Sequence, residues 1–243
     1  MKRILFYSSV NSLELFKTQK FYQIDISILK DLGYDVLLSN RIFDSLLFWK
    51  YDILFSYFYR YSFFAALLAK CFGKKTYFTG GIDSLDSDYA SAFNYKIQAL
   101  FFKLCYWVAD SCIIVSQSDL KNIFKVSSLK KKLSYSEHVI NTKLFIADVP
   151  KEKIFTSIVW MGDEGNVVRK GVDKALQIFA ELKKIPEFVD YRFVIIGRKG
   201  EGEVLVRSII DKYNLKGSVE LKGEVSEEDK NIIFNFHCMR DLV

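Results

Sequence analysis

Two kinds of hydrophobic pattern alternate along most of this chain. Short apolar runs of four to seven residues predict buried strands of a parallel sheet. Longer segments with apolar residues every three or four positions predict helices. The expected strands cover residues 3–7, 36–38, 52–55, 76–79 and 112–115, then 155–161, 192–196 and 219–221. Strands that alternate with helices over short connections indicate an α/β fold with a mostly parallel sheet.

The helices between these strands each show one apolar stripe that we expect to face the core. Gly33 and Gly73 follow two of them, where a left-handed residue commonly ends a helix. Ser116 with Asp119, and Ser226 with Asp229, have the spacing of a capping box at a helix start. The predicted core stripes are Phe21, Ile24, Ile28 and Leu32; Tyr61, Phe64, Leu68 and Cys71; Ile97, Phe101, Leu104 and Val108; Val172, Leu176, Phe179 and Leu182; and Val204, Ile209 and Tyr213.

The alternation weakens after Lys132 and starts again near residue 154. We interpret residues 139–153 as a linker and predict two Rossmann-like domains, one over residues 1–150 and one over residues 151–243. Ligands of such sheets bind at the carboxyl ends of the strands. Any site should therefore involve the loops that follow the predicted strands.

Composition narrows the class of protein. Half of the 243 residues are hydrophobic, which argues against long disordered stretches. The net charge of +6 is spread out apart from Lys130–Lys132, so no nucleic-acid-binding surface is predicted. The N-terminus lacks a signal-peptide pattern, and the four cysteines lack metal-ligand spacing. We expect reduced, mostly buried cysteines and a cytoplasmic protein that is soluble or peripheral on the inner face of the cell membrane.

The aromatic content is high, with 22 Phe and 14 Tyr. Aromatic-filled cores are the simpler interpretation, and a surface that meets a membrane or a saccharide is the other. Tyr57, Phe58, Tyr59 and Tyr61 could form such a surface, although a strand end and a helix face in the core fit them better. Only His138 and His237 are available for histidine chemistry, so zinc hydrolysis and a Ser-His-Asp triad are not expected. His138 is interpreted as structural.

Five segments in order resemble glycosyltransferase family 4, whose members have the GT-B fold of two Rossmann-like domains. In the first half they are ADSCIIVSQSDLKNI and HVINTKLF, and in the second half VWMGDEGNVVRKGVDKALQIFAEL, YRFVIIGRKGEGE and NLKGSVELKGEVSEEDKNIIF. The similarity spans residues 108–236, and before that only the architecture is shared. The resemblance implies a retaining transfer of sugar from a nucleotide-sugar donor, without cofactor or metal, to a saccharide or lipid-linked acceptor in cell-surface glycan synthesis.

The resemblance also places the donor site in the second half of the chain. Arg169, Lys170 and Gly171 stand before a predicted helix, whose positive end favours an anion. The lysine of this Lys-Gly pair contacts the donor diphosphate in the family, and Lys170 takes that role by position. An ordinary exposed basic loop is the alternative. The other expected donor-binding residues are Gly162, Gly197, Arg198 and Gly223.

Several positions depart from the family pattern. Asp163 follows Gly162 where the family often has arginine. On the acceptor side, TGGID stands where the family commonly has a His-Gly-x-Asp loop. Asp83 of this segment is therefore the candidate catalytic residue, with a turn-stabilising role as the alternative. Gly80 and Gly81 would let a substrate approach.

The family's "P-S-x-x-E-G-F-G" loop should follow the helix near residues 226–236, and HCMRDLV stands there instead. We therefore expect the second domain to be incomplete and this polypeptide to be inactive by itself. A second hypothesis is a non-catalytic glycosyltransferase-like module that binds a membrane or a partner enzyme.

Overall fold

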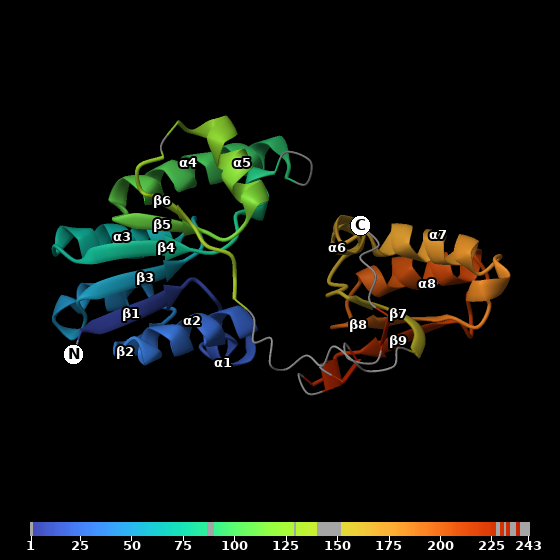
Figure 1. Ribbon diagram of the computed structural model, residues 1–243. Helices are drawn as coiled ribbons and strands as arrows, with labels where there is room; N and C mark the ends of the chain where they lie inside the picture. The colour runs from blue at the N-terminus through green and yellow to red at the C-terminus, as the bar shows by residue number, and fades with distance from the viewer. Residues whose placement is uncertain are drawn as a thin grey trace. The chain divides into compact units, whose positions relative to one another are not determined.

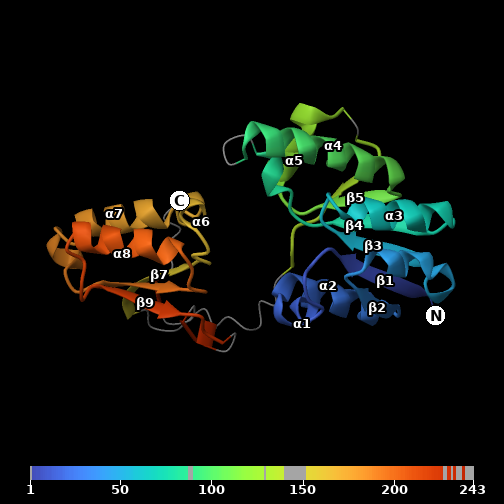
Figure 2. The same ribbon diagram turned by 180° about the vertical axis from the view of Figure 1, so that it is seen from behind.

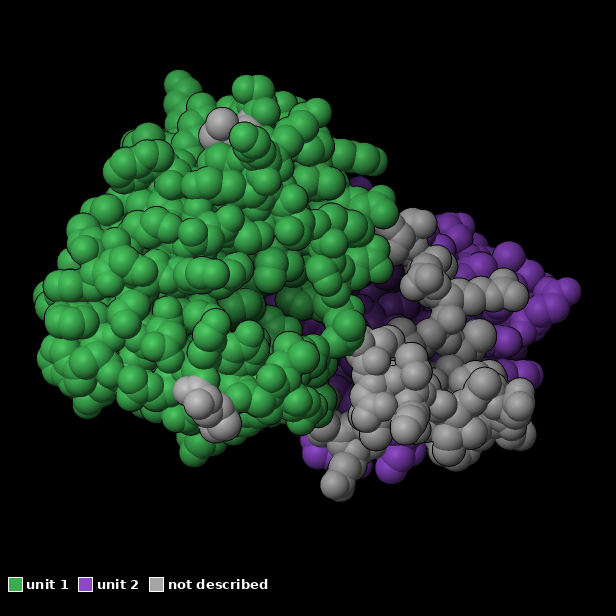
Figure 3. All heavy atoms as spheres, turned by 60° about the vertical axis from the view of Figure 1, so that its left-hand side comes forward, with its two compact units in different colours: residues 1–140 green, residues 141–243 purple. Residues whose placement is uncertain are grey.

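In the computed structural model the chain forms two compact units, residues 1–140 and 141–243 (Figure 3). The predicted domain boundary at residue 150 lies outside the described residues. The structure describes residues 2–86, 90–128, 130–139, 152–226, 229–230, 232–233 and 237–238, with only the backbone of Asp83, His237 and Cys238.

The first unit is built on a six-stranded parallel sheet in the order β2-β1-β3-β4-β5-β6 (Figure 1). Each strand is short, and the central strands β1, β3 and β4 are rich in β-branched or aromatic residues, as buried parallel strands are. The strands are β1 (Arg3–Ser8), β2 (Asp35–Ser39), β3 (Ile53–Tyr57), β4 (Lys75–Thr79), β5 (Ser111–Ile114) and β6 (Leu133–Tyr135).

Helices connect these strands, and two cores lie between helices and sheet. One core contains α3 and α4 with the strands β3, β4 and β5, and the other contains α2 with the strands β1 and β3. The helices are α1 (Leu15–Thr18), α2 (Lys20–Asp31), α3 (Ser62–Cys71), α4 (Ala92–Val108) and α5 (Gln117–Val126), with 3-10 turns η1 (Ile42–Leu46), η2 (Phe48–Lys50) and η3 (Asp83–Leu85).

The second unit repeats the plan around a parallel sheet in the order β10-β7-β8-β9; Figure 1 labels β7, β8 and β9 of this sheet. Its elements are β7 (Glu152–Ile158), α6 (Glu164–Arg169), α7 (Val172–Leu182), the 3-10 turn η5 (Pro186–Phe188), β8 (Arg192–Ile196), α8 (Gly202–Lys212), β9 (Val219–Gly223) and β10 (His237–Cys238). The predicted α/β class with two Rossmann-like domains is confirmed.

The predicted strands are all present, and one of them is displaced. The strand expected over residues 155–161 begins three residues earlier, at Glu152, so residues 152 and 153 do not belong to the linker. Both predicted caps are also present. Ser116 Oγ accepts hydrogen bonds from the amides of Ser118 and Asp119, and Ser226 Oγ accepts one from the amide of Asp229.

The predicted core stripes of the helices in the first unit are right only in part. Helix α2 buries Tyr22 and Ile26 rather than Ile28 and Leu32, which are exposed. Helix α4 buries the predicted Val108, but it also buries Phe102 and Cys105, whereas the predicted Phe101 and Leu104 are only half-buried. In both helices apolar residues occur on more than one side, so spacing alone does not select the inner side.

Helix α3 turns the predicted stripe outward. Tyr61, Phe64 and Cys71 are exposed, and the helix instead buries Phe63 and three alanines. Small alanines let the helix lie close to the sheet, and this close contact leaves the larger side chains outside. In the second unit the α7 stripe is right, since Val172, Leu176 and Phe179 are buried. In α8 the predicted Ile209 is buried, whereas Val204 is exposed.

The buried aromatics follow the core interpretation in part. Tyr57 and Tyr59 are buried, as expected for a strand end, while Tyr61 is exposed. Cys105 and Cys112 are buried and free, and burial raises the pKa of both thiols. Within the described part of the chain, no helix has the length and apolar content required to cross a bilayer.

Candidate functional site

Three loops meet at the carboxyl ends of the strands in the second unit. Beyond β7 the chain stays beside β8, because the amide of Val159 donates to the carbonyl of Ile196 and that of Met161 to Arg198. On the other side of β8 the amide of Gly197 donates to the carbonyl of Gly223 over 2.9 Å. Backbone hydrogen bonds therefore hold the ends of β7, β8 and β9 together.

Three glycines allow the loop after β8 to pack directly on the loop after β7. A Cβ at Gly197, whose φ is +139°, would lie 1.9 Å from the carbonyl oxygen of Val159. Cβ atoms at Gly200 and Gly202 would lie 2.4 Å from the carbonyl oxygens of Met161 and Asp163. Only glycine fits such approaches. Sequence reasoning selected Gly197 but missed Gly200 and Gly202, although the G-x-x-G-x-G spacing marked them.

The segment between β7 and α7 contains a helix that the sequence analysis did not predict. Asp163 caps α6, since its Oδ1 accepts a hydrogen bond from the amide of Asn166 over 2.7 Å. The residue that departs from the family pattern therefore has a structural role here. Gly162 precedes this cap, and its carbonyl accepts a hydrogen bond from the amide of Glu201.

Arg169, Lys170 and Gly171 form a corner between α6 and α7. Arg169 is the last residue of α6, Lys170 is its C-cap, and Gly171 is the N-cap of α7 with φ +67° in the left-handed region. The predicted position of the basic pair directly before a helix start is confirmed. The open amides at the start of α7 carry partial positive charge, which favours an anion at this corner.

The basic side chains around these loops differ in their partners. Lys170 is exposed and has no hydrogen-bond or ion-pair partner among the residues that the structure describes. Arg169 donates to Asn166 Oδ1 over 3.2 Å, and Arg198 lies 3.5 Å from Glu224 in an exposed ion pair. Lys170 is thus the most available cation of the predicted donor-binding set. Ligand contacts are still only predicted for Gly162, Gly197, Arg198 and Gly223.

The first unit has its own hollow at the carboxyl ends of β1, β3 and β4, with a volume of about 510 Å³. It contains the predicted Gly80 and Gly81 together with Tyr61, Arg60 and His138. A mixture of aromatic rings, small residues and a few polar groups is typical of sites that bind small molecules.

The wall of this hollow has an unusual backbone. Phe58 adopts φ +67°, which is rare for a residue with a side chain, and its amide donates to the carbonyl of Thr79 over 2.8 Å. Gly80, with φ +108°, lies against it, because a Cβ there would be 3.1 Å from the Phe58 ring. Such conformations persist where the surroundings fix them, and they are frequent at functional sites.

Arg60 is a polar residue of this hollow that the sequence analysis missed. Its Nε is buried and has no hydrogen-bond partner in the described part of the chain, and its guanidinium lies 5.5 Å from the centre of the Tyr61 ring. A buried donor without a partner is costly, so a bound acceptor atom would be stabilising here. A basic residue within an otherwise aromatic and apolar segment was the signal that could have identified it.

The predicted catalytic Asp83 begins the turn η3, and its side chain lies outside the described part of the structure. The neighbouring loop is fixed by another carboxylate, since Asp119 Oδ2 accepts a hydrogen bond from the amide of Ile82 over 3.1 Å. Asp119 was expected only as a capping-box residue of α5. It therefore also positions the segment that contains Gly80, Gly81 and Asp83.

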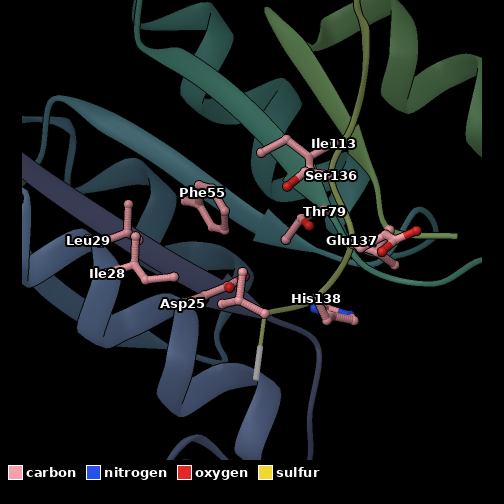
Figure 4. A pocket seen from close by; sticks show the side chains of 11 residues that line it. Asp25, Ile28, Leu29, Phe55, Thr79, Ile113, Ser136, Glu137 and His138 are labelled. Carbon is pink, nitrogen blue, oxygen red and sulfur yellow. The ribbon is translucent and has the colours of Figure 1, made fainter. Parts of the chain in front are cut away.

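A second, smaller hollow of about 240 Å³ lies between α2, the sheet and the segment that follows β6 (Figure 4). Asp25 enters it from α2, and His138 lies on the segment after β6. Asp25 accepts a hydrogen bond from the hydroxyl of Tyr57. Burial raises the pKa of Asp25, and the Tyr57 hydrogen bond and the His138 charge partly oppose that rise. The sequence analysis missed Asp25, an acid within an apolar helix.

Within the described residues, no three His, Cys, Asp or Glu side chains gather as a metal site would require. The expected absence of a metal and of a cofactor stays a prediction.

Known proteins share the fold of this chain, and one family model matches a segment of it. Residues 165–237 match the family described as glycosyl transferases group 1. Among solved structures, HepE of Anabaena in complex with UDP is similar at 12% identity and a TM-score of 0.67, over 98% of this chain and 73% of that one. Sucrose-phosphate synthase of Thermosynechococcus elongatus is similar at 13% identity and a TM-score of 0.65, over 98% and 75%. TarM, at 16% identity and a TM-score of 0.57, is matched over 77% of this chain and 35% of TarM. No curated protein matches this chain.

The fold is therefore that of the GT-B glycosyltransferases, and the matched family covers α6, α7, β8, α8 and β9 of the second unit. The corner at Lys170 and the three glycines after β8 lie within the matched segment. The first unit, with the hollows described above, is matched through the fold alone.

Proposed function

We propose that the reaction of this chain, a glycosyltransferase with the GT-B fold and a group 1 domain in its second unit, is the transfer of a sugar from a nucleoside diphosphate sugar to a saccharide or lipid-linked acceptor. The expectation that this polypeptide is inactive by itself stays a prediction. The proposal includes retention of configuration at the anomeric carbon and a role in cell-surface glycan synthesis. The observation that carries it is the corner of Arg169, Lys170 and Gly171 at the start of α7, inside the matched family segment.

The chemistry explains why this corner is suited to the reaction. When the bond between the anomeric carbon and the diphosphate oxygen breaks, negative charge grows on the diphosphate. Lys170, with Arg169 beside it, supplies positive charge, and the amides at the start of α7 supply hydrogen-bond donors. Gly171 has no side chain to obstruct the phosphates. The acceptor hydroxyl attacks the same side of the sugar, and its proton passes to the leaving diphosphate. No metal is required in this scheme.

The proposed acceptor site is the hollow of about 510 Å³ in the first unit, which contains Gly80 and Gly81. It offers the Tyr61 and Phe58 rings to a sugar or lipid portion and the Arg60 guanidinium to an anionic group. Asp83 is proposed as an acceptor-side group because it begins η3 two residues after Gly81. We further propose that the chain acts in the cytoplasm, as the free, buried thiols of Cys105 and Cys112 would suit.

The test is binding of UDP, GDP and their sugars by calorimetry. A charge-assisted contact contributes about 1.5–3 kcal/mol, so Lys170→Ala should weaken nucleotide binding about tenfold to a hundredfold. Lys212→Ala is the matched control. Lys212 is the last residue of α8 and so lies near the amino ends of the parallel strands, away from the corner. It should leave the affinity unchanged.

Equal affinities for Lys170→Ala and the unchanged protein would refute the assigned diphosphate contact. If the chain binds none of these nucleotides, the alternative of a non-catalytic module that binds a membrane or a partner enzyme is favoured. The configuration of the product, determined by NMR from the coupling constant of the anomeric proton, tests retention.

A further inference from the structure

The outer side of α3 and α4 carries large apolar side chains that the fold does not use. On α4, Phe93, Leu100 and Trp107 are 72%, 56% and 70% exposed and follow one another at intervals of seven residues. This interval keeps them on one side of the helix. On α3, Phe64 and Phe72 are exposed, as is Tyr61 directly before the helix.

Ring contacts join aromatic residues of this side into two groups, one near each end of α3. Phe48 of η2 stacks on Phe72 of α3 with 4.4 Å between ring centres, and Trp49 lies edge-on to Phe48. At the other end of α3, the half-buried Phe101 of α4 lies 6.2 Å from both Phe64 and Tyr61. The helices α3 and α4 are neighbours in the fold (Figures 1 and 2). We call this surface the aromatic face; it comprises Phe48, Trp49, Tyr61, Phe64, Phe72, Phe93, Leu100 and Trp107.

The charges of the same elements all have one sign. The sequences of η2, α3 and α4 contain Lys50, Lys70, Lys96 and Lys103 and no aspartate or glutamate. Lys70 is held by Asp110, which follows α4, at 2.9 Å. Lys50, Lys96 and Lys103 are exposed. An exposed apolar surface of this extent marks an interaction site, and its lysines match a negatively charged partner.

We propose that the aromatic face docks on the surface of a lipid bilayer that contains anionic lipids. Trp and Tyr side chains favour the boundary between headgroups and acyl chains, where lysines also meet lipid phosphates. The helices lie on the membrane rather than cross it, as exposed apolar side chains with basic residues among them indicate. This proposal does not depend on sugar transfer.

The position of the aromatic face suits the proposed acceptor site. Tyr61 belongs to the face and also lines the hollow that contains Gly80 and Gly81. A docked bilayer would therefore meet the protein beside the opening of that hollow. A lipid-linked acceptor could enter it without leaving the membrane entirely, which favours the lipid-linked class among the acceptors proposed above.

Vesicle sedimentation in the absence of nucleotide tests the docking. The chain should sediment with vesicles of phosphatidylcholine and phosphatidylglycerol, stay in solution with phosphatidylcholine alone, and be released by high salt. Each lysine near an anionic surface contributes about fivefold to the partition coefficient, so Lys96→Gln with Lys103→Gln should lower it about 25-fold. Lys30→Gln, on an exposed position of α2, is the matched control and should have no effect.

The apolar contribution is tested in the same assay. Phe93→Ser with Trp107→Ser should lower the partition coefficient at least tenfold, whereas Leu32→Ser, an equally exposed position after α2, should not. Since these side chains are exposed, the variants should keep the near-UV circular dichroism of a folded chain. When Trp49 and Trp160 are replaced by Phe, Trp107 is the remaining tryptophan, and brominated lipid should quench its fluorescence in the vesicle-bound protein.

Two results would overturn the proposal. One is sedimentation that does not depend on phosphatidylglycerol or on Lys96 and Lys103. The other is a dimer in analytical ultracentrifugation that Phe93→Ser with Trp107→Ser dissociates, because a second copy of the chain would then cover the face. Neither result bears on nucleotide binding at Lys170, so failure of this proposal differs from failure of the proposed function.

Discussion

The packing of the loop after β8 gives a stringent prediction for Gly197. In Gly197→Ala the new Cβ would lie 1.9 Å from the carbonyl oxygen of Val159, far inside normal contact. That carbonyl belongs to the segment that pairs with β8, since the amide of Val159 is bonded to Ile196. The clash therefore falls on backbone, and it cannot be relieved by turning a side chain.

The expected loss of stability has two parts. A residue with a side chain at φ +139° costs about 1–3 kcal/mol. Forcing the two loops apart costs about a further 1–3 kcal/mol, by analogy with overpacked cores. The sum of about 2–6 kcal/mol is a large fraction of the 5–15 kcal/mol that stabilises a typical domain. The second unit should unfold at a much lower urea concentration.

Gly217→Ala provides a matched control in the same unit. Gly217 also has a positive φ, +85°, but a Cβ there would meet nothing within 4 Å. This variant should lose only about 1 kcal/mol from the backbone conformation. Urea unfolding can follow the second unit alone through Trp160 when Trp49 and Trp107, which belong to the first unit, are replaced by Phe.

The comparison decides whether the close approach stabilises the unit. The contradicting result is that the two variants have free energies of unfolding that agree within about 0.5 kcal/mol. In that case the loops after β7 and β8 do not pack as closely at Gly197 as the structure indicates, and the explanation of the G-x-x-G-x-G segment is wrong.

Two further substitutions test the first unit by urea unfolding. Asp25→Asn should stabilise it at neutral pH, because burial raises the pKa of Asp25 and the charged carboxylate is therefore unfavourable in the folded state. The difference from the unchanged protein should disappear as pH falls below the ordinary aspartate pKa, and an effect independent of pH would contradict this cause. Ser116→Ala should cost about 1 kcal/mol through loss of the α5 cap, whereas Ser118→Ala, on an exposed helical position, should cost less than half of that. Equal losses would show that the cap does not stabilise α5.

The alternation of strands and helices could be predicted from the sequence because it depends on local pattern. Buried parallel strands are short apolar runs, and the glycines and serines at helix ends have local conformational causes. The corner at Lys170 was predictable for the same reason, since it combines a basic pair with a helix start. Helix α6 was missed because six residues, capped by Asp163, are too few to show a periodic stripe.

The hollows of the first unit could not be predicted in the same way. Arg60, Asp25 and His138 are far apart in sequence and are brought near each other only by the order of the strands and by the segment after β6. The order β2-β1-β3-β4-β5-β6 is not contained in the pattern of any single element. A polar residue in an apolar segment was the one available signal, and it indicates that a partner is needed without indicating which.

The predicted core side of α3 is wrong, and the reason is a property of this helix. The stripe of Tyr61, Phe64 and Leu68 has the spacing of a core side, yet the buried side contains Ala65, Ala66 and Ala69, which a hydrophobic pattern weights less. A helix whose small residues face its sheet and whose large rings face outward has apolar surface in excess of what the fold buries. Since exposed aromatic surface favours aggregation, we infer that it is kept because something covers it. Where a helix has both alanine-rich and aromatic-rich sides, the aromatic side is therefore a candidate for docking before it is a candidate for the core.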